Sequence, residues 1–514
     1  MPTYLSPGVY VEEVESGSRP IEGVGTAVAA FVGFAAQGPF NTPTLVSNWG
    51  QFNQVFGEFV DGCYLAHAVY GYFLNGGGNC YIVRVGGSRN NGAKAVGGPQ
   101  AVIGGYRVVT RELPANSRGG DITVEVADHT PGEGQPPSED KFNLVVKRGG
   151  KVAETFEGVT TKRGKDNVVT VVRERSKLIT IEEDASAGPV TAPQRGSVAL
   201  KDVPVPPPVP RQIVTDDYVG DVSERTGVGG LEAIDEITMV AAPDLMSAYQ
   251  RSAVDLETVK AVQLAMVAHC ELMGDRMAIL DPPPGLSPQQ VKDWRVDLAG
   301  YDSKYATLYY PWVKVFDPAS GSNQFVPPSG HMSGVWARND ASRGVHKAPA
   351  NEVVRGAIAV ETQLTRMEQE LLNPIGVNCV RSFPGRGIRV WGARTLSSDP
   401  AWRYLNVRRL FNYLEESILD GTQWVVFEPN DDALWARIRR TISAFLVMEW
   451  RKGALFGLTP DEAFYVKCDR ETNPAESIDA GQVVCEIGVA PVKPAEFVIF
   501  RLAQMSGGTS LVNE

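Results

Sequence analysis

The feature that most constrains this fold is an alternation of short apolar runs with helical segments through the middle of the chain. Three apolar runs are residues 237–244 (ITMVAAPD), residues 276–285 (RMAILDPPPG) and the later YATLYYPWVKVFD. Two segments with helical spacing separate them, AVDLETVKAVQLAMVAHCELM and VKDWRVDLAGY. Such alternation is typical of a parallel sheet covered on both faces. TAVAAFVGFAA and CYIVRV, nearer the N-terminus, read as two further buried strands. We therefore predict an α/β middle domain from residues 21–86 and 211–350.

The two parts of this domain are separated by a region of different composition. Residues 87–210 contain none of the nine Trp and none of the six Cys. They carry four short runs that we predict as strands: DITVEVAD, KFNLVVKRGG, NVVTVVRE and KLITIEE. A Gly-rich stretch at one end and VPVPPPVP at the other predict a flexible and a stiff connection. Residues 87–210 are therefore expected to form an inserted, β-rich outer domain.

Residues 351–514 change pattern again and are expected to form an α+β inner domain. AIAVETQLTRMEQELLN places four apolar residues on one helical face: Val360, Leu364, Met367 and Leu371. Six later runs are predicted strands: IGVNCVRSF, IRVWGART, TQWVVFEPN, FYVKCD, VVCEIGVAPV and AEFVIFRLAQ. The predicted fold class is thus multidomain, with α/β and α+β parts and an inserted β-rich domain.

Both ends of the chain carry short apolar segments. Residues 1–20 contain a strand-like run whose centre is Val9, Tyr10 and Val11. Near the other end, a run is apolar on both faces: Phe497, Val498, Ile499 and Phe500. Because strand backbone groups need partners, such segments suit addition to the sheet of a neighbouring molecule. We predict the first as an N-terminal arm and the second as a C-terminal arm.

A long predicted helix, residues 432–452, is amphipathic. Its apolar stripe is Leu434, Ile438, Ile442 and Phe445, and three basic residues lie on or near the opposite face: Arg437, Arg440 and Arg451. Two interpretations remain open for the basic face. Charge pattern alone favours an ordinary solvated surface, and the alternative is a docking surface for an acidic partner.

Composition excludes several classes of function. The net charge of −11 argues against a nucleic-acid-binding protein. No apolar run reaches the roughly 20 residues of a membrane helix, and the N-terminus has no secretory pattern. We expect synthesis in the cytoplasm, no membrane insertion by this chain and no nucleic-acid contact.

Three acidic residues lie at predicted strand ends, where ligands of parallel sheets bind. Asp244, Asp281 and Asp317 follow apolar strands, so a hydrolase or transferase using these carboxylates is the alternative function. No His, Ser or Lys constellation accompanies them, and turn-forming Asp is common. GGGN and GVGG lack nucleotide-binding spacing. The six cysteines and five histidines are scattered, which favours neither a zinc site nor a disulfide framework. We predict no catalytic, cofactor or metal residues.

Several stretches together resemble one known family. PGVYVEE, TAVAAFVGFAAQGP, CYIVRV and NPIGVNCVRSFPGRGIRVWGARTL are similar to the sheath proteins of contractile tails, which include phage tail sheaths, R-type pyocins and contractile injection systems. The resemblance covers residues 1–86 and most of 211–505. A tail-tube or baseplate protein is a third reading, but a tube subunit is expected to be smaller.

The resemblance implies a structural protein rather than an enzyme. Such subunits stack as six-fold rings into a helical sleeve around an inner tube, exchange terminal strands with their neighbours, and contract to drive the tube through a target envelope. The implied partners are other copies of the chain, the tube protein, and baseplate and terminal cap proteins. The C-terminal domain would face the tube, which makes Arg437, Arg440 and Arg451 candidate tube contacts. The particle is expected to assemble in the cytoplasm and to be released from the cell in some systems.

Overall fold

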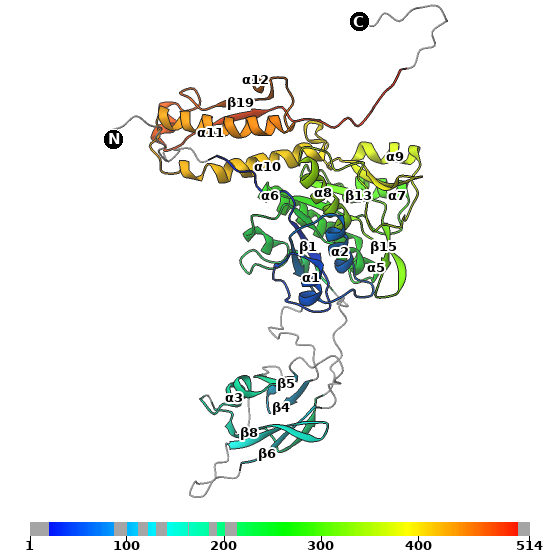
Figure 1. The fold of residues 1–514 in the computed structure, drawn as a ribbon. Helices are drawn as coiled ribbons and strands as arrows, with labels where there is room; N and C mark the ends of the chain where they lie inside the picture. Colours follow the sequence, from blue (N-terminus) through cyan, green and yellow to red (C-terminus); the bar gives the residue numbers. More distant parts are fainter. Residues whose placement is uncertain are drawn as a thin grey trace, which may run out of the picture. The chain divides into compact units, whose positions relative to one another are not determined.

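The computed structural model describes residues 20–86, 100–110, 122–129, 141–162, 164–183, 193–200 and 213–501, drawn in colour in Figure 1. The chain is a mixed α/β protein with several sheets. It divides into two compact units, one formed by Ser88–Pro207 and the other by Met1–Gly87 with Pro208–Glu514. The smaller unit has nearly the same bounds as the insertion expected at residues 87–210.

The larger unit is built on an eight-stranded sheet. Its strands, in spatial order, are β18 (Gly387–Trp391), β17 (Val377–Phe383), β13 (Ala306–Tyr310), β12 (Met277–Leu280), β11 (Met239–Ala241), β1 (Ala29–Gly33), β3 (Cys80–Arg84) and β2 (Thr44–Val46). The six inner strands are parallel to one another, whereas the edge strands β18 and β2 are antiparallel to their neighbours. The predicted parallel α/β arrangement is confirmed.

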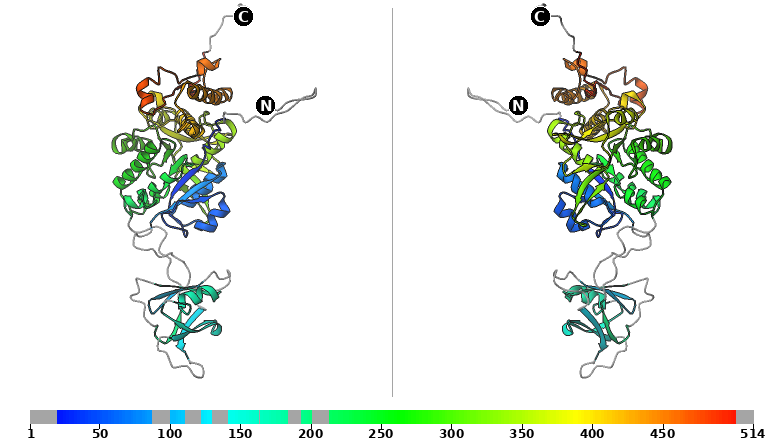
Figure 2. Two further views of the ribbon diagram at one scale, coloured as in Figure 1. Left: turned by 90° about the vertical axis from the view of Figure 1, so that its left-hand side faces the viewer. Right: turned by 90° about the vertical axis from the view of Figure 1, so that its right-hand side faces the viewer.

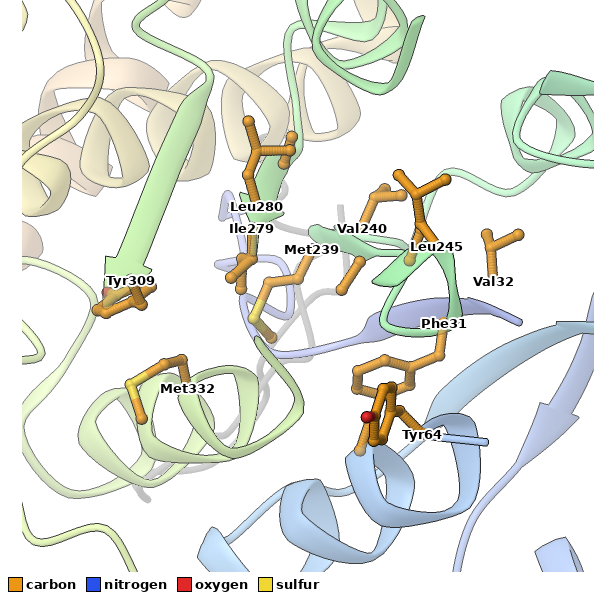
Figure 3. Close-up of a cluster of buried hydrophobic side chains, with 14 of the residues drawn as sticks. Phe31, Val32, Tyr64, Met239, Val240, Leu245, Ile279, Leu280, Tyr309 and Met332 are labelled. Atoms are coloured by element: carbon orange, nitrogen blue, oxygen red, sulfur yellow. The ribbon is translucent and has the colours of Figure 1, made fainter. Parts of the chain in front are cut away.

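The main hydrophobic core lies between this sheet and its helices. Figure 3 shows Phe31 of β1, Met239 of β11, Ile279 of β12 and Tyr309 of β13 in one cluster with Met332, which comes from a helix. All of β1 is buried, as expected for a central parallel strand covered on both faces. The continuous apolar runs of the sequence are explained by this double cover.

Helices connect and cover the strands of the large sheet. They are α1 (Trp49–Phe56), α2 (Leu65–Asn75), α4 (Thr215–Val219), α5 (Asp244–Gln250), α6 (Leu256–Met273), α7 (Pro288–Asp293), α8 (Ser329–Arg343) and α9 (Arg366–Leu372). Shorter helical turns are η3 (Gly229–Ala233), the π-helical η4 (Trp294–Ala299), η5 (Asn373–Ile375) and η6 (Pro400–Trp402). Helices α2 and α8 approach closely, because a Cβ atom at Gly330 would clash with Ala68 and one at Gly334 with the Tyr72 carbonyl.

A second core follows at the C-terminal end of the larger unit, where α10 (Leu405–Gly421) and α11 (Asp432–Arg451) run side by side (Figures 1 and 2). The small elements of this layer are η7 (Gln423–Val425), α12 (Pro460–Ala463), β19 (Phe464–Lys467), α13 (Ala475–Asp479) and β20 (Glu486–Val489). Helix α10 contributes to both cores, because Leu405 packs in the first and Leu410 and Leu414 pack in the second.

The boundary expected between residues 350 and 351 falls inside the large-sheet region. Strands β17 and β18 extend that sheet from β13, and the change of core occurs within α10. The sequence pattern identifies a strand but carries little information about which sheet it joins.

The inserted unit contains two small sheets and one helix. One sheet has the order β10 (Gly196–Ala199), β6 (Ile122–Asp128), β7 (Lys141–Arg148) and β8 (Lys151–Thr160), and the other β4 (Gln100–Ile103), β5 (Tyr106–Thr110) and β9 (Ile179–Glu183). The predicted strand NVVTVVRE is wrong, because it forms helix α3 (Val168–Arg175). Asn167 caps this helix, and Val168 and Val172, four residues apart, face the core.

Other local predictions also change. YATLYYPWVKVFD forms two strands, because the chain leaves the large sheet after β13 and enters a separate sheet of β15 (Ser322–Val326), β14 (Val313–Asp317) and β16 (Ala359–Val360). The helix expected from Val360 onward is wrong over its first half: it begins only after Thr365, whose side chain forms a capping box with Glu368. Met367 is 79% exposed rather than core-facing. TQWVVFEPN is not a strand, since it forms the 3-10 turn η7.

Candidate assembly interface

The predicted C-terminal arm is exposed and forms no strand within the described part of this subunit. The side chains of Phe497, Val498, Ile499 and Phe500 are 72%, 67%, 78% and 85% exposed. Four consecutive large apolar side chains in water are unfavourable, and such exposed apolar patches mark interaction sites. The strand prediction therefore fails for the isolated subunit, because no sheet edge of this subunit pairs with the segment.

The residue before this segment is firmly held. Glu496 accepts hydrogen bonds from Arg394 Nη2 at 2.6 Å and Nε at 2.9 Å, from Asn373 Nδ2 at 2.8 Å and from the Tyr404 hydroxyl at 3.2 Å. Burial alone would raise the pKa of the Glu496 carboxyl, but the bonds from Arg394 and Asn373 hold it below its usual value. We call this cluster of Asn373, Arg394, Tyr404 and Glu496 the C-terminal anchor.

The first described residues at the other end are also fastened to α10. The Val24 amide donates to Ser417 Oγ at 3.1 Å. Thr26 donates to Asp340 Oδ2 at 2.7 Å, and Arg409 joins both residues by binding Asp340 and the Thr26 carbonyl. Val9, Tyr10 and Val11, the predicted N-terminal arm, lie outside the described residues. The structure thus describes the attachment of the N-terminal segment and not the arm itself.

Strands β19 and β20 form a two-stranded antiparallel sheet. One face packs on the second core through the cross-strand pairs Phe464–Val489 and Val466–Ile487, whereas Tyr465 on the other face is exposed. Two strands alone are marginally stable, and the outer edge of each has no strand partner among the described residues. This sheet is therefore a candidate acceptor for additional strands.

Helix α11 presents its predicted apolar stripe to the second core. Leu434, Ile438, Ile442 and Phe445 are all buried, which confirms the predicted inner face. The Asp431 side chain caps the helix by accepting from the Leu434 amide at 2.7 Å.

The three predicted arginines of α11 differ in their surroundings. Arg440 and Arg451 are exposed. Arg437 is half-buried, because its guanidinium lies 4.5 Å from the centroid of the Trp424 ring and pairs with Glu428 at 3.0 Å. Arg440 and Arg451 are therefore available for an acidic partner, whereas Arg437 also holds the Trp424 turn.

The strand-end carboxylates serve structural roles. Asp244 accepts from the backbone amides of Phe34, Tyr64 and Leu65 and so ties β1 and the start of α2 to α5. Asp281 accepts from the amide and the hydroxyl of Ser329 at the start of α8.

Asp317 binds the amides of Ala319 and Ser320 in the turn after β14, and it lies 3.3 Å from His67 Nε2. Each of the three carboxylates is thus occupied by hydrogen bonds that hold segments of the fold together.

The pKa values of these carboxyls follow from the balance between burial and hydrogen bonding. Burial raises the pKa of Asp244 to about 7 against the opposing effect of its backbone hydrogen bonds, and it raises that of Asp281 to about 7 against the bonds from Ser329. Burial also opposes ionisation of Asp317, but the bonds from Ser320 and Ala319 and the nearby His67 hold its pKa below the usual value.

The described ranges contain no cluster of three or more His, Cys, Asp or Glu that could hold a metal ion. Within the same ranges, no helix is both long and apolar enough to cross a bilayer. All six cysteines are free thiols.

Two family models match the chain in consecutive regions. The phage tail sheath protein central domain matches residues 223–396, and the phage tail sheath C-terminal domain matches residues 397–504. Together these matches span more than half of the chain. The chain belongs to the phage tail sheath family. The change between the two family domains, at residues 396 and 397, lies shortly before α10, where the structure changes core.

Relatives of the sheath family match over different lengths. The tail sheath protein of Burkholderia phage BcepMu is 26% identical over 522 residues, which cover 96% of this chain and 95% of the relative. The tail sheath protein of Vibrio phage KVP40 is 27% identical over 243 residues, which cover 44% of this chain but only 35% of that longer relative.

A solved sheath structure matches nearly the whole chain. It is the helical sheath of the anti-feeding prophage in the contracted state, with 25% identity and a TM-score of 0.59, covering 98% of this chain and 100% of that one. The chain is thus a tail sheath subunit, and it is structural rather than enzymatic. The alternative of a hydrolase or transferase using Asp244, Asp281 or Asp317 is wrong.

Proposed function

We propose that the subunit polymerises as helically stacked six-fold rings around an inner tube and contracts to drive the tube through a target envelope. The match to a contracted helical sheath over 98% of this chain supports the proposal. The proposed partners are other copies of the subunit, an acidic inner tube, and baseplate and terminal cap proteins. The particle forms in the bacterial cytoplasm and acts outside it.

The observation that carries the proposal is the exposed apolar segment held at the C-terminal anchor. Burying its four side chains in a neighbour contributes about 1.5–3 kcal/mol each, which gives about 6–12 kcal/mol before costs. Ordering four backbone residues costs about 4–8 kcal/mol. The net gain per joint is therefore small, and backbone hydrogen bonds to a sheet edge are needed for a useful joint.

The open edges of β19 and β20 are the proposed acceptors. The C-terminal arm, Phe497 to Phe500, of one neighbour and the N-terminal arm, Val9 to Val11, of another add to this sheet. Joints that are weak singly become strong in a lattice. They also allow subunits to rotate about their arms during contraction.

Helix α11 supplies the proposed tube contact. Arg440 and Arg451 attract an acidic tube surface, and Arg437 supports the contact through its place on Trp424. In this arrangement the C-terminal layer with the N-terminal arm is innermost, the middle domain lies outside it, and the inserted unit is outermost. Deletion of residues 88–209 is therefore expected to spare sheath formation.

Expression of the chain alone, followed by negative-stain electron microscopy, tests the proposal. Hollow striated tubes are the expected result, either from the chain alone or after addition of the tube protein. Dispersed particles under both conditions would contradict the proposal.

The tube contact is tested separately by the double variant Arg440→Glu and Arg451→Glu. It is expected to lose tube-templated assembly, while Arg366→Glu in α9 serves as the exposed, matched control. Equal templating by both variants would remove α11 from the interface.

A further inference from the structure

Two cysteines that are distant in the sequence lie opposite each other at one end of the β19–β20 sheet. The last paired residues of the register are Lys467 and Glu486. The next positions along the two antiparallel strands are Cys468 and Cys485, so the register places them as cross-strand neighbours. Each thiol also contributes to the pKa shift of the other, in keeping with this proximity.

The type of cross-strand pair follows from the register. The Ala490 amide donates to the Ala463 carbonyl at 2.8 Å, which makes positions 463 and 490 a hydrogen-bonded pair. Because pair types alternate along an antiparallel ladder, the Cys pair, five positions further, is a non-hydrogen-bonded pair. The Cα atoms of such pairs are about 4.5 Å apart, within the range of about 4.4–6.8 Å that disulfides usually span.

The two thiols differ in access. Both occupy the core-facing side of the sheet, which they share with Phe464 and Val466. Cys468 is fully buried, and Asn473 Nδ2 lies 3.8 Å from its sulfur. Cys485 is only half-buried. A small reagent can therefore reach the Cys485 sulfur first. Cys468 is the neighbouring residue on the same face of the sheet and is less accessible to solvent.

We propose that Cys468 and Cys485 form a redox-modifiable site that closes into an intramolecular disulfide by exchange with a small disulfide. The Cys485 thiolate attacks one sulfur of the small disulfide, which forms a mixed disulfide and releases one small thiol. Cys468 then attacks the Cys485 sulfur and releases the second small thiol. The two protein thiols are oxidised, the small disulfide is reduced, and both thiol protons leave with the small thiols.

The disulfide would close the loop of residues 469–484, which contains α13. A cross-link at this position joins the C-terminal end of β19 to the N-terminal end of β20. It also reduces the conformational entropy of this loop in the unfolded chain. The pair stays reduced in cytoplasm and oxidises where small disulfides predominate. This inference concerns the single subunit and does not rest on the proposed mode of assembly.

Peptide mapping of the folded full-length chain tests the inference. The protein is incubated with oxidised glutathione, alkylated with iodoacetamide and digested with trypsin without reduction. Cleavage after Lys467, Arg470 and Arg501 yields a diagnostic product in which residues 468–470 are linked to residues 471–501. Its rate of formation should rise about tenfold per pH unit near neutrality, because burial raises the pKa of Cys485 to about 12 and the thiolate is the reactive form.

Single variants test the order of attack. Cys468→Ser should stop at one stable glutathione adduct on Cys485, and Cys485→Ser should leave the buried Cys468 unmodified. The four other cysteines, all buried, are internal controls that stay unlinked. In the wild-type chain, a Cys485 that is alkylated or carries glutathione without the linked product would overturn the inference, and this reading needs no variant to fold.

Discussion

The eight-stranded sheet and the β19–β20 sheet belong to the same unit but differ in how much of their hydrogen bonding is completed within one subunit. In the large sheet, the six inner strands have partners on both sides, and the core between them and the helices is buried. In the small sheet each strand has one partner. The exposed segment Phe497 to Phe500 is likewise incomplete in a single subunit.

Different regions of the subunit therefore determine its folding stability and its assembly. Side chains of the large sheet are needed for folding whether or not neighbours are present. Side chains on the outer face of the small sheet, such as Tyr465, and those of the C-terminal arm contribute little to stability until another subunit binds. Substitutions in the two regions should therefore separate into folding defects and assembly defects.

The largest effect is expected from making the arm polar. The double variant Phe497→Ser and Ile499→Ser removes two apolar side chains on one face of the proposed strand. The loss is about 3–6 kcal/mol per joint, or two to four orders of magnitude in the assembly constant. Sedimentation and electron microscopy should show subunits without tubes and with an unchanged circular dichroism spectrum. Leu272→Ser, equally exposed on α6, is the control, and loss of tubes in both would argue against a specific arm.

A second, smaller effect is expected on the free energy of unfolding of the isolated subunit, and its size should differ between the two sheets. Phe31→Ala in β1 leaves a cavity in the main core and should lower the free energy of unfolding by about 3–5 kcal/mol. Tyr465→Ala on the exposed face of β19 should change it by at most about 0.5 kcal/mol. Urea denaturation of the unassembled chain measures both. Similar losses for the two variants would show that the outer face of the small sheet already stabilises the isolated subunit.

The smallest effect is expected at the C-terminal anchor. Glu496→Gln loses the charge paired with Arg394 and should weaken protection of the amide of residue 496, which donates to the Pro494 carbonyl, by about 1–2 kcal/mol in hydrogen-exchange mass spectrometry. The folded-state pKa of Glu496 lies below the ordinary value of 4.5. The stabilisation is therefore present above pH 4.5 and is lost as the pH falls through the lower folded-state value.

The glutamine variant should lack this acid dependence. Glu370→Gln breaks the exposed pair with Arg366 and should change protection little. An anchor segment that exchanges equally fast in wild type and Glu496→Gln at pH 7 would contradict the role of Glu496.

The large sheet could be predicted from the sequence because double burial leaves a strong local signal. Apolar runs such as that around Phe31 read as buried strands wherever they pair. The local signal was misleading at Val168 to Val172, where β-branched residues favour a strand but Asn167 caps a helix. It was also misleading at Phe497 to Phe500, where the apolar run has no partner in its own subunit.

The anchor and the cysteine pair could not be predicted because they depend on register and on distant contacts. Arg394 and Glu496 are 102 residues apart, and charge pattern alone does not join them. Cys468 and Cys485 both lie within predicted strands, FYVKCD and VVCEIGVAPV, and pairing of those strands in the correct register would place them opposite each other. Arg440 and Arg451 of α11 are exposed, as their position opposite the apolar stripe predicts, but the stacking of Arg437 on Trp424 depends on a turn that is predicted as a strand.

Helix α10 has a mechanical consequence. The C-terminal anchor includes Tyr404, directly before the helix, while Arg409 and Ser417 within it hold Thr26 and Val24. Tension applied to the chain at either end therefore reaches the same rigid rod. The load passes from one attachment to the other along about three and a half turns of helix. A neighbouring subunit that pulls on one terminal segment would thus rotate α10, and this rotation would also move the attachment of the other terminal segment.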